Sequence, residues 1–122
     1  MAVRLRVPEV DDPDFVAEVD GDTLRLVGSA DTAATRALAA LLETLHTELL
    51  RRRVVALVVD LTALDFMSSG CLRELVAWFG RLEELAADAR YAIRLRSNPT
   101  IAWQRSAIPA LTCFGPVVVM ET

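Results

Sequence analysis

The chain has 122 residues, about the size of one ordinary domain, and its 53% hydrophobic content is enough to bury a core without disulfides. With 25% charged residues, it does not have the composition of a disordered protein. Its net charge of −4 argues against nucleic acid or an anionic membrane as the main partner.

The N-terminal segment, residues 1–14, precedes a single predicted domain over residues 15–122. Residues 4–7 alternate in hydropathy like an edge strand, but Pro8 and Pro13 limit any strand there to a short one. The segment has no signal-peptide h-region, and no run in the chain reaches the ~18 apolar residues of a membrane span. We therefore predict a cytoplasmic protein with no membrane partner.

A hairpin and a long helix follow. Residues 15–19 and 23–27 have the pattern of strands, and the Asp-Gly pair between them favours a tight turn. Asp31 is placed to cap a helix over residues 32–52. The apolar positions of this helix recur at helical spacing: Ala34, Leu38, Leu41, Leu42, Leu45 and Leu49.

The central element is an apolar run at residues 54–59, β-branched at four of its six positions, which predicts a strand buried on both faces. We expect this strand to end at Asp60 and an exposed loop to carry Ser68 and Ser69 to a second helix over residues 70–88. The predicted buried stripe of that helix has seven members: Leu72, Leu75, Val76, Phe79, Leu82, Leu85 and Ala86.

Trp78 falls between the apolar and polar stripes of this helix, so it is either an edge of the core or a partner contact. Residues 91–96 alternate as a further strand, with Arg94 and Arg96 on one face. Five residues are expected to be nearly fully buried: Leu57, Val59, Leu75, Phe79 and Ile93.

The C-terminal part predicts one more helix and one more strand. Asn98 followed by Pro99 is a good helix start, and Pro109 should end that helix, which gives residues 99–107. A last strand is expected at residues 117–120. The order β-β-α-β-α-β-α-β predicts an α/β fold, a mixed sheet of four to five strands with parallel central strands and three to four helices.

The chain shows no catalytic or metal-binding pattern. Cys71 and Cys113 lack the spacing of a metal motif, and we expect both to be reduced, in or near the core. A serine hydrolase would need a base beside Ser68 or Ser69, and the single histidine, His46, is predicted on a helix flank. We therefore predict a protein that is not an enzyme and needs no cofactor.

Two segments, GSAD at residues 28–31 and DLTALDFMSSGCLREL at residues 60–75, resemble the STAS family, and in particular the stand-alone anti-sigma factor antagonists of bacteria. The resemblance covers residues 15–121. Gly28 and Asp31 match a Gly-Glu-Leu-Asp-like motif of the family. The rest of the match follows the central strand: Asp60-Leu61-Thr62, then the pair Phe66-Met67, then the hydroxyls Ser68-Ser69.

The resemblance implies a STAS-like fold and a role in protein–protein switching. In the family, an antagonist binds an anti-sigma factor kinase, and phosphorylation of a loop serine or threonine breaks the complex. Phosphorylatable members commonly read Asp-Ser-Ser/Thr-Gly-Leu. Aligned without a gap, this chain has Ser68 at the aspartate, Ser69 at the first hydroxyl and Gly70 at the phosphorylated position. Sliding by one residue makes Ser69 the phosphosite but places Met67 at the aspartate.

Several side chains of this loop have a structural and a functional interpretation. Ser69 is the predicted N-cap of the second helix and also the first phosphorylation candidate, with Ser68 the second. Asp31 is either a helix cap or part of the same surface, and Asp60 is either a solvated strand end or an acceptor that braces the loop. The predicted partner-binding residues are Asp31, Asp65, Ser68, Ser69, Gly70 and Arg73.

The partner implied by the resemblance is an anti-sigma factor or serine kinase. The alternative is a phosphorylation-independent STAS scaffold that docks a partner, or self-associates, through the same loop. The sequence leaves the identity of the partner and the oligomeric state open.

Overall fold

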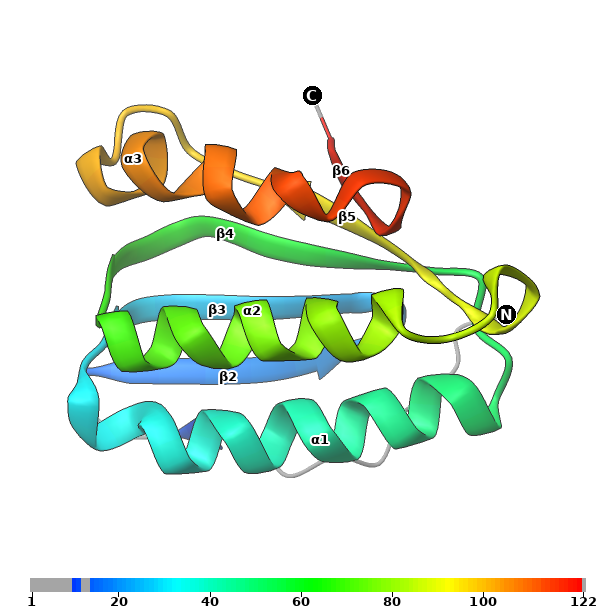
Figure 1. The fold of residues 1–122 in the computed structure, drawn as a ribbon. Coiled ribbons are helices and arrows are strands. Elements are labelled where there is room, and N and C mark those ends of the chain that lie inside the picture. The colour runs from blue at the N-terminus through cyan, green and yellow to red at the C-terminus, as the bar shows by residue number, and fades with distance from the viewer. Residues whose placement is uncertain (1–9, 12–13, 122) are drawn as a thin grey trace.

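The computed structural model describes residues 10–11 and 14–121 and shows one six-stranded sheet in the order β1-β2-β3-β4-β5-β6 (Figure 1). The pairs β1–β2 and β2–β3 are antiparallel and the remaining pairs are parallel. The strands are β1 Val10–Asp11, β2 Phe15–Asp20, β3 Thr23–Ala30, β4 Ala56–Met67, β5 Ala92–Arg96 and β6 Val118–Met120. The predicted mixed α/β sheet is confirmed, with the two-residue β1 as an additional edge strand.

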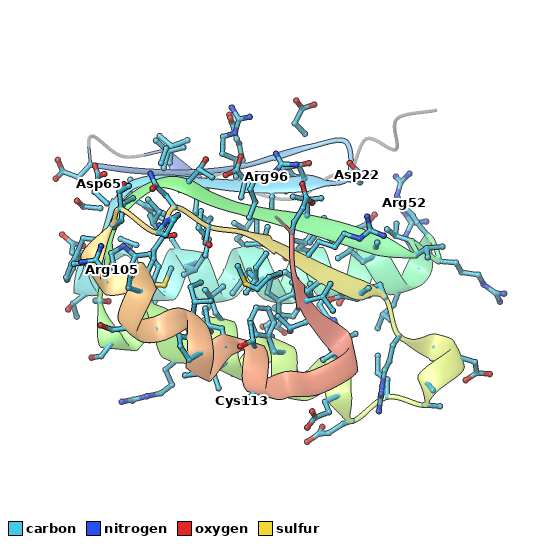
Figure 2. The ribbon with its side chains drawn as sticks, turned by 90° about the horizontal axis from the view of Figure 1, so that it is seen from above. Asp22, Arg52, Asp65, Arg96, Arg105 and Cys113 are labelled. Atoms are coloured by element: carbon cyan, nitrogen blue, oxygen red, sulfur yellow. The ribbon has the colours of Figure 1, made fainter. Side chains whose placement is uncertain are left out.

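Three α-helices connect neighbouring parallel strands: α1 Thr35–Arg51, α2 Ser69–Glu83 and α3 Ala102–Leu111. Single turns of 3-10 helix, η1 Thr32–Ala34 and η2 Ala87–Ala89, and a longer one, η3 Thr112–Val117, complete the chain. Because right-handed crossovers that advance in one direction place their helices on one face, all three helices lie on the same side of the sheet (Figures 1 and 2). The core lies between this face and α1 and α2.

The predicted core is confirmed. Leu57, Val59, Leu75, Phe79 and Ile93 are all 0% exposed. The six apolar positions predicted for the first helix are buried as well. The hairpin is also confirmed, since β2 and β3 pair in register and Gly21 has a φ of 63° in the turn between them.

The predicted helix ends are wrong in two places. The second helix ends at Glu83 rather than at residue 88, because the Arg90 guanidinium donates to the carbonyls of Glu83 at 2.6 Å and Leu85 at 2.8 Å and so satisfies the end of the helix. The third helix begins at Ala102 and contains Pro109. Because proline has no amide N–H, Pro109 cannot donate to the Arg105 carbonyl, and the helix continues only two residues beyond it.

The predicted cap of that third helix is also different. The Asn98 side chain accepts from the Thr100 amide at 3.0 Å, and the residue that precedes the helix is Ile101. Asn98 therefore forms a local turn rather than a cap.

The central strand is twice as long as predicted. Residues 54 and 55 precede it, Val55 is 82% exposed, and β4 continues past Asp60 to Met67. Because β5 pairs only with the first half of β4, the later carbonyls need other partners. Gln104 of α3 supplies them: it is 0% exposed, and its Nε2 donates to Leu61 O at 2.7 Å and Leu64 O at 3.1 Å.

A hydrogen-bonded chain joins α1 and α2 to Tyr91, the residue before β5. The Trp78 indole N–H donates to the Tyr91 hydroxyl at 2.6 Å, and that hydroxyl lies 2.7 Å from His46 Nδ1. Since indole is only a donor, the Tyr91 oxygen accepts from Trp78, and the tautomer of His46 sets the direction of the second bond. Trp78 is 0% exposed, so the alternative that it contacts a partner is wrong.

This arrangement predicts a pH-dependent stability. Burial, and secondarily the charge of Arg81, lowers the pKa of His46 below its ordinary value of 6.5. As pH falls through about 6.5, the unfolded chain takes up a proton before the folded chain does, so the free energy of unfolding should fall. We expect urea unfolding at pH 7.5 and 5.5 to show this loss.

Replacing the imidazole removes its titration, so His46→Gln should lose less stability than the wild type over that interval. Carboxylates with lowered pKa values, such as that of Asp60, act at lower pH and do not mask the effect. An equal loss in both proteins would contradict the role given to His46.

The remaining predictions concern the two cysteines, the N-terminal strand and membrane spans. Cys71 is buried and free, as expected, whereas Cys113 is free but exposed in η3, so its predicted place in or near the core is wrong. The edge strand predicted at residues 4–7 lies outside the described residues. No helix in the described part of the chain is long and apolar enough to cross a membrane.

Candidate functional site

The N-terminus of α2 is capped by Ser68. Its side chain accepts from the Cys71 amide at 3.2 Å, and its backbone is extended, as an N-cap requires. The prediction that Ser69 is the cap is therefore wrong by one residue. Ser68 is only 8% exposed, while Ser69 is the first residue of the helix and is exposed.

Contacts between the ends of β3 and β4 hold this helix start in place. The Ser68 amide donates to Ala30 O at 2.7 Å, and the Cys71 thiol donates to Asp31 O at 3.3 Å. A Cβ on Gly70 would lie 3.1 Å from Thr35 Oγ1, so the small residue lets the starts of α1 and α2 approach each other. Asp31 itself caps η1, accepting from the Ala33 amide at 3.0 Å, which confirms the capping interpretation.

Four predicted partner-binding side chains are exposed at this end of the sheet: Asp31, Asp65, Ser69 and Arg73. Gly70 is half-buried. Figure 2 shows Asp65 at this end of the molecule. The structure thus brings the predicted residues to the carboxyl edge of the parallel strands, but it removes Ser68 from the accessible set.

Phe66 was absent from the predicted binding residues. It lies between Asp65 and Met67 near the end of β4 and is 47% exposed, among the largest exposed apolar side chains in the described part of the chain. An aromatic residue between an exposed acid and two serines was the available signal in the sequence. We call the exposed set Asp31, Asp65, Phe66, Ser69 and Arg73 the end surface.

Asp60 is not a solvated strand end. It is 6% exposed within β4, and its Oδ1 accepts from the Thr62 amide at 2.9 Å and hydroxyl at 2.6 Å. Burial alone would raise the pKa of this carboxyl, but the Thr62 hydrogen bonds and the charges of Arg96 and Arg25 outweigh it and hold the pKa below its usual value. Asp60 therefore stays ionised and fixes the middle of the sheet rather than the loop before α2.

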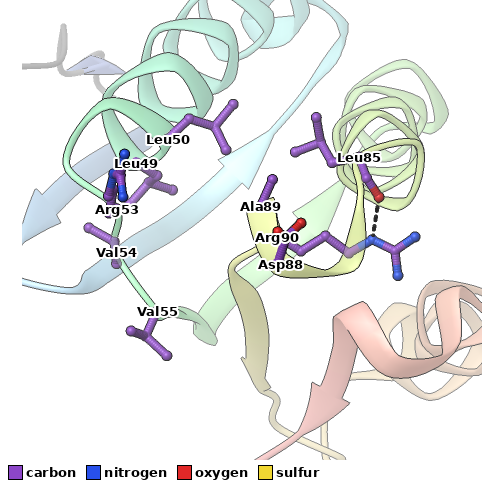
Figure 3. Close-up of a pocket in the computed structure, with 9 residues that line it drawn as sticks. All are labelled: Leu49, Leu50, Arg53, Val54, Val55, Leu85, Asp88, Ala89 and Arg90. Atoms are coloured by element: carbon purple, nitrogen blue, oxygen red, sulfur yellow. Dashed lines mark hydrogen bonds between the residues drawn. The ribbon is translucent and has the colours of Figure 1, made fainter.

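The opposite end of the sheet carries His46 and a surface pocket. The pocket has a volume of about 670 Å³ and lies between the end of α1 and η2 (Figure 3). Its lining is mostly apolar: Leu49, Leu50, Arg53, Val54, Val55, Leu85, Asp88, Ala89 and Arg90. Since Tyr91, the partner of His46, also precedes β5 at this end, the histidine lies away from Ser68 and Ser69.

A metal site was not predicted, and the described residues contain no group of three or more histidine, cysteine, aspartate or glutamate side chains that could hold a metal ion. The chemistry available at the end surface is therefore that of hydroxyl, carboxylate, guanidinium and aromatic groups at a helix N-terminus. Such a set can bind another protein, and the exposed hydroxyl can accept a phosphoryl group.

Comparisons with known proteins agree with the fold. No protein-family model and no curated protein matches the sequence. Among solved structures, the chain is similar to an anti-sigma factor antagonist from Mycobacterium paratuberculosis, with 18% identity and a TM-score of 0.55 over 97% of this chain and 89% of that one. The chain therefore has the fold of an anti-sigma factor antagonist, as its resemblance to the STAS family predicted.

Proposed function

We propose that this chain is a non-enzymatic regulatory protein of the cytoplasm that binds an anti-sigma factor through the end surface. The observation that carries the proposal is the likeness in fold to an anti-sigma factor antagonist along nearly the whole chain. The half-exposed Phe66 supports it, because an aromatic side chain among polar neighbours is a common anchor of protein interfaces.

Ser69 is the proposed point of control. Its hydroxyl is exposed at the first position of α2, where the helix dipole and the free amides of the first turn tolerate negative charge. A phosphate there should leave the fold intact and instead place charge and bulk in the interface. Ser68 is the weaker candidate, since its hydroxyl is already engaged with the Cys71 amide.

Ser69→Asp should therefore weaken binding of the anti-sigma factor at least tenfold, which is about 1.4 kcal/mol, while the melting temperature stays close to that of the wild type. Isothermal titration of the purified anti-sigma factor measures the first effect, and circular dichroism measures the second. Ser69→Ala should bind normally and resist phosphorylation when the kinase and ATP are added, as followed by intact-mass spectrometry.

Ser106→Asp is the matched control, because Ser106 is an exposed serine on α3, outside the end surface. It should bind as the wild type does. Phe66→Ala should weaken binding whether or not phosphorylation occurs. If both Ser69→Asp and Phe66→Ala bind with wild-type affinity, docking at the end surface is wrong.

A phosphorylation-independent scaffold is the second candidate. It is favoured by the half-buried Gly70, which stands at the phosphorylated position of the family when the loop is aligned without a gap. In that case Phe66→Ala still weakens binding, but no phosphate appears on Ser68 or Ser69.

A further inference from the structure

We call the face of the sheet turned away from α1, α2 and α3 the open face, because no helix among the described residues covers it. Side chains along each strand alternate between the two faces, and those directed at α1 and α2 are buried. On the opposite face, which carries Arg96 in Figure 2, no described helix lies. Most side chains there are half-buried or exposed, and they form two rows of strand neighbours that carry a regular pattern of charge.

The first row crosses four strands with alternating sign. Glu18 of β2 is the register partner of Arg25 of β3. Arg25 is in turn the partner of Asp60 of β4, and Asp60 is the partner of Arg96 of β5. Both arginines lie 3.8 Å from Asp60 Oδ2, and their side chains are 54% and 43% exposed against 8% for the aspartate. These four charges alternate from minus to plus, and Glu121, which binds Arg96 at 2.6 Å, adds a negative charge beside the last of them. Both arginines are more exposed than Asp60.

The second row lies two residues along the strands and has charge only at its ends. In strand register, Asp20 is the partner of Thr23, and Thr23 is the partner of Val58. Val58 is in turn the partner of Arg94. Asp20 and Arg94 are exposed, whereas Thr23 and Val58 are half-buried. Together with Glu121, which binds Arg96 at 2.6 Å, the two rows hold four acids and three arginines, so their net charge of −1 favours neither a polyanion nor a strongly basic partner.

The pattern is complementary to itself. A two-fold axis parallel to the strands, midway between β3 and β4, would lay a second copy on the first with β3 over β4 and β2 over β5. The first row then meets its own reverse, so that Glu18 faces Arg96 and Arg25 faces Asp60 of the other copy. In the second row Asp20 faces Arg94.

We propose that the open face of the sheet binds a second copy of this chain in a two-fold, face-to-face dimer. Packed sheets lie ~10 Å apart, a gap that an arginine and a carboxylate span together. The half-buried valines of the face, Val16, Val27 and Val58, supply apolar contact, and the charge pairs set the orientation. Asp20 and Arg94 lie outside the end surface, so a test at these two residues can disprove the dimer without disproving the proposed function.

A charge-swap pair tests this geometry. Neither Asp20 nor Arg94 has an ion pair among the described residues, so Asp20→Arg and Arg94→Glu should both fold. In a dimer of either variant, residue 20 of each copy faces a residue 94 of the same charge, so two repulsive pairs form. Each variant should therefore self-associate at least tenfold more weakly than the wild type. Mixed in equal amounts, the two should form a heterodimer, because each changed residue then meets its opposite.

Sedimentation equilibrium up to millimolar concentration measures all of these species, and circular dichroism confirms that each variant is folded. Arg36→Glu, an exposed arginine of α1, is the control for net charge and should dimerise like the wild type. A monomeric wild type overturns the proposal. So does an unchanged dimer in either swap variant, a mixture that does not associate, or a control that is weakened as much as Arg94→Glu.

Discussion

Replacing Gly28 by alanine should lower the free energy of unfolding by about 2–6 kcal/mol, the sum of the ranges for a strained backbone conformation and an overpacked site. Gly28 has a φ of 97°, a conformation that side chains other than glycine rarely adopt. An added Cβ would lie 2.2 Å from Asp14 O, which is backbone and accepts from the Ser29 amide at 2.7 Å. The added Cβ would therefore clash with a backbone oxygen, which cannot move aside as the end of a flexible side chain could.

Gly80→Ala is the matched control, since Gly80 lies within α2 and a Cβ there meets no atom within 4 Å. Alanine is the better helix former by roughly 1 kcal/mol, so this variant should be slightly more stable than the wild type. Urea unfolding should therefore show a lower free energy of unfolding for Gly28→Ala and a slightly higher one for Gly80→Ala. An unchanged stability of Gly28→Ala would mean that the chain does not pass Asp14 this closely in solution.

Leu75→Ala should cost about 2–5 kcal/mol, because it removes buried methyl groups and leaves a cavity. Leu75 is 0% exposed on the face of α2 that packs into the core, with Phe79 one turn further along. Unfolding by urea, with the slope on denaturant compared between variants, measures the loss.

Leu72→Ala provides the comparison within the same helix. Leu72 is only half-buried, so its truncation should cost clearly less than that of Leu75. A loss below about 1 kcal/mol for Leu75→Ala, well under the usual range for buried leucines, would show that the helix packs on another face.

Elements whose burial follows a local period were predictable from the sequence. The leucines of α1 recur at helical spacing, and the alternation of Ile93 and Leu95 with Arg94 and Arg96 defines both faces of β5. The hairpin follows from its Asp-Gly pair. In each case the residues that set the structure lie within a few positions of one another.

The errors come from contacts that are distant in the sequence. Asp60 looked like a strand end, because the partners that keep it in the sheet, Arg25 and Arg96, belong to other strands. The continuation of β4 depends on Gln104, about forty residues away, whose side chain replaces a missing neighbour strand.

At the candidate site, the segment was predicted but the cap was not. Ser68 and Ser69 are adjacent hydroxyls at one helix start, and local preference does not choose between them. The choice depends on the bond between the Ser68 amide and Ala30 O, which anchors Ser68 to β3 and leaves Ser69 outside. This long-range bond also decides which of the two hydroxyls is exposed.

The order of the strands across the sheet is the order of the strands along the chain. Each strand therefore pairs with the one synthesised just before it, and no strand has to wait for a distant later segment before it finds its neighbour. Since chains emerge from the ribosome N-terminus first, the sheet can grow by one strand and one covering helix at a time. A parallel sheet is thereby assembled with the shortest loops its crossovers allow, which lowers the entropic cost of folding it.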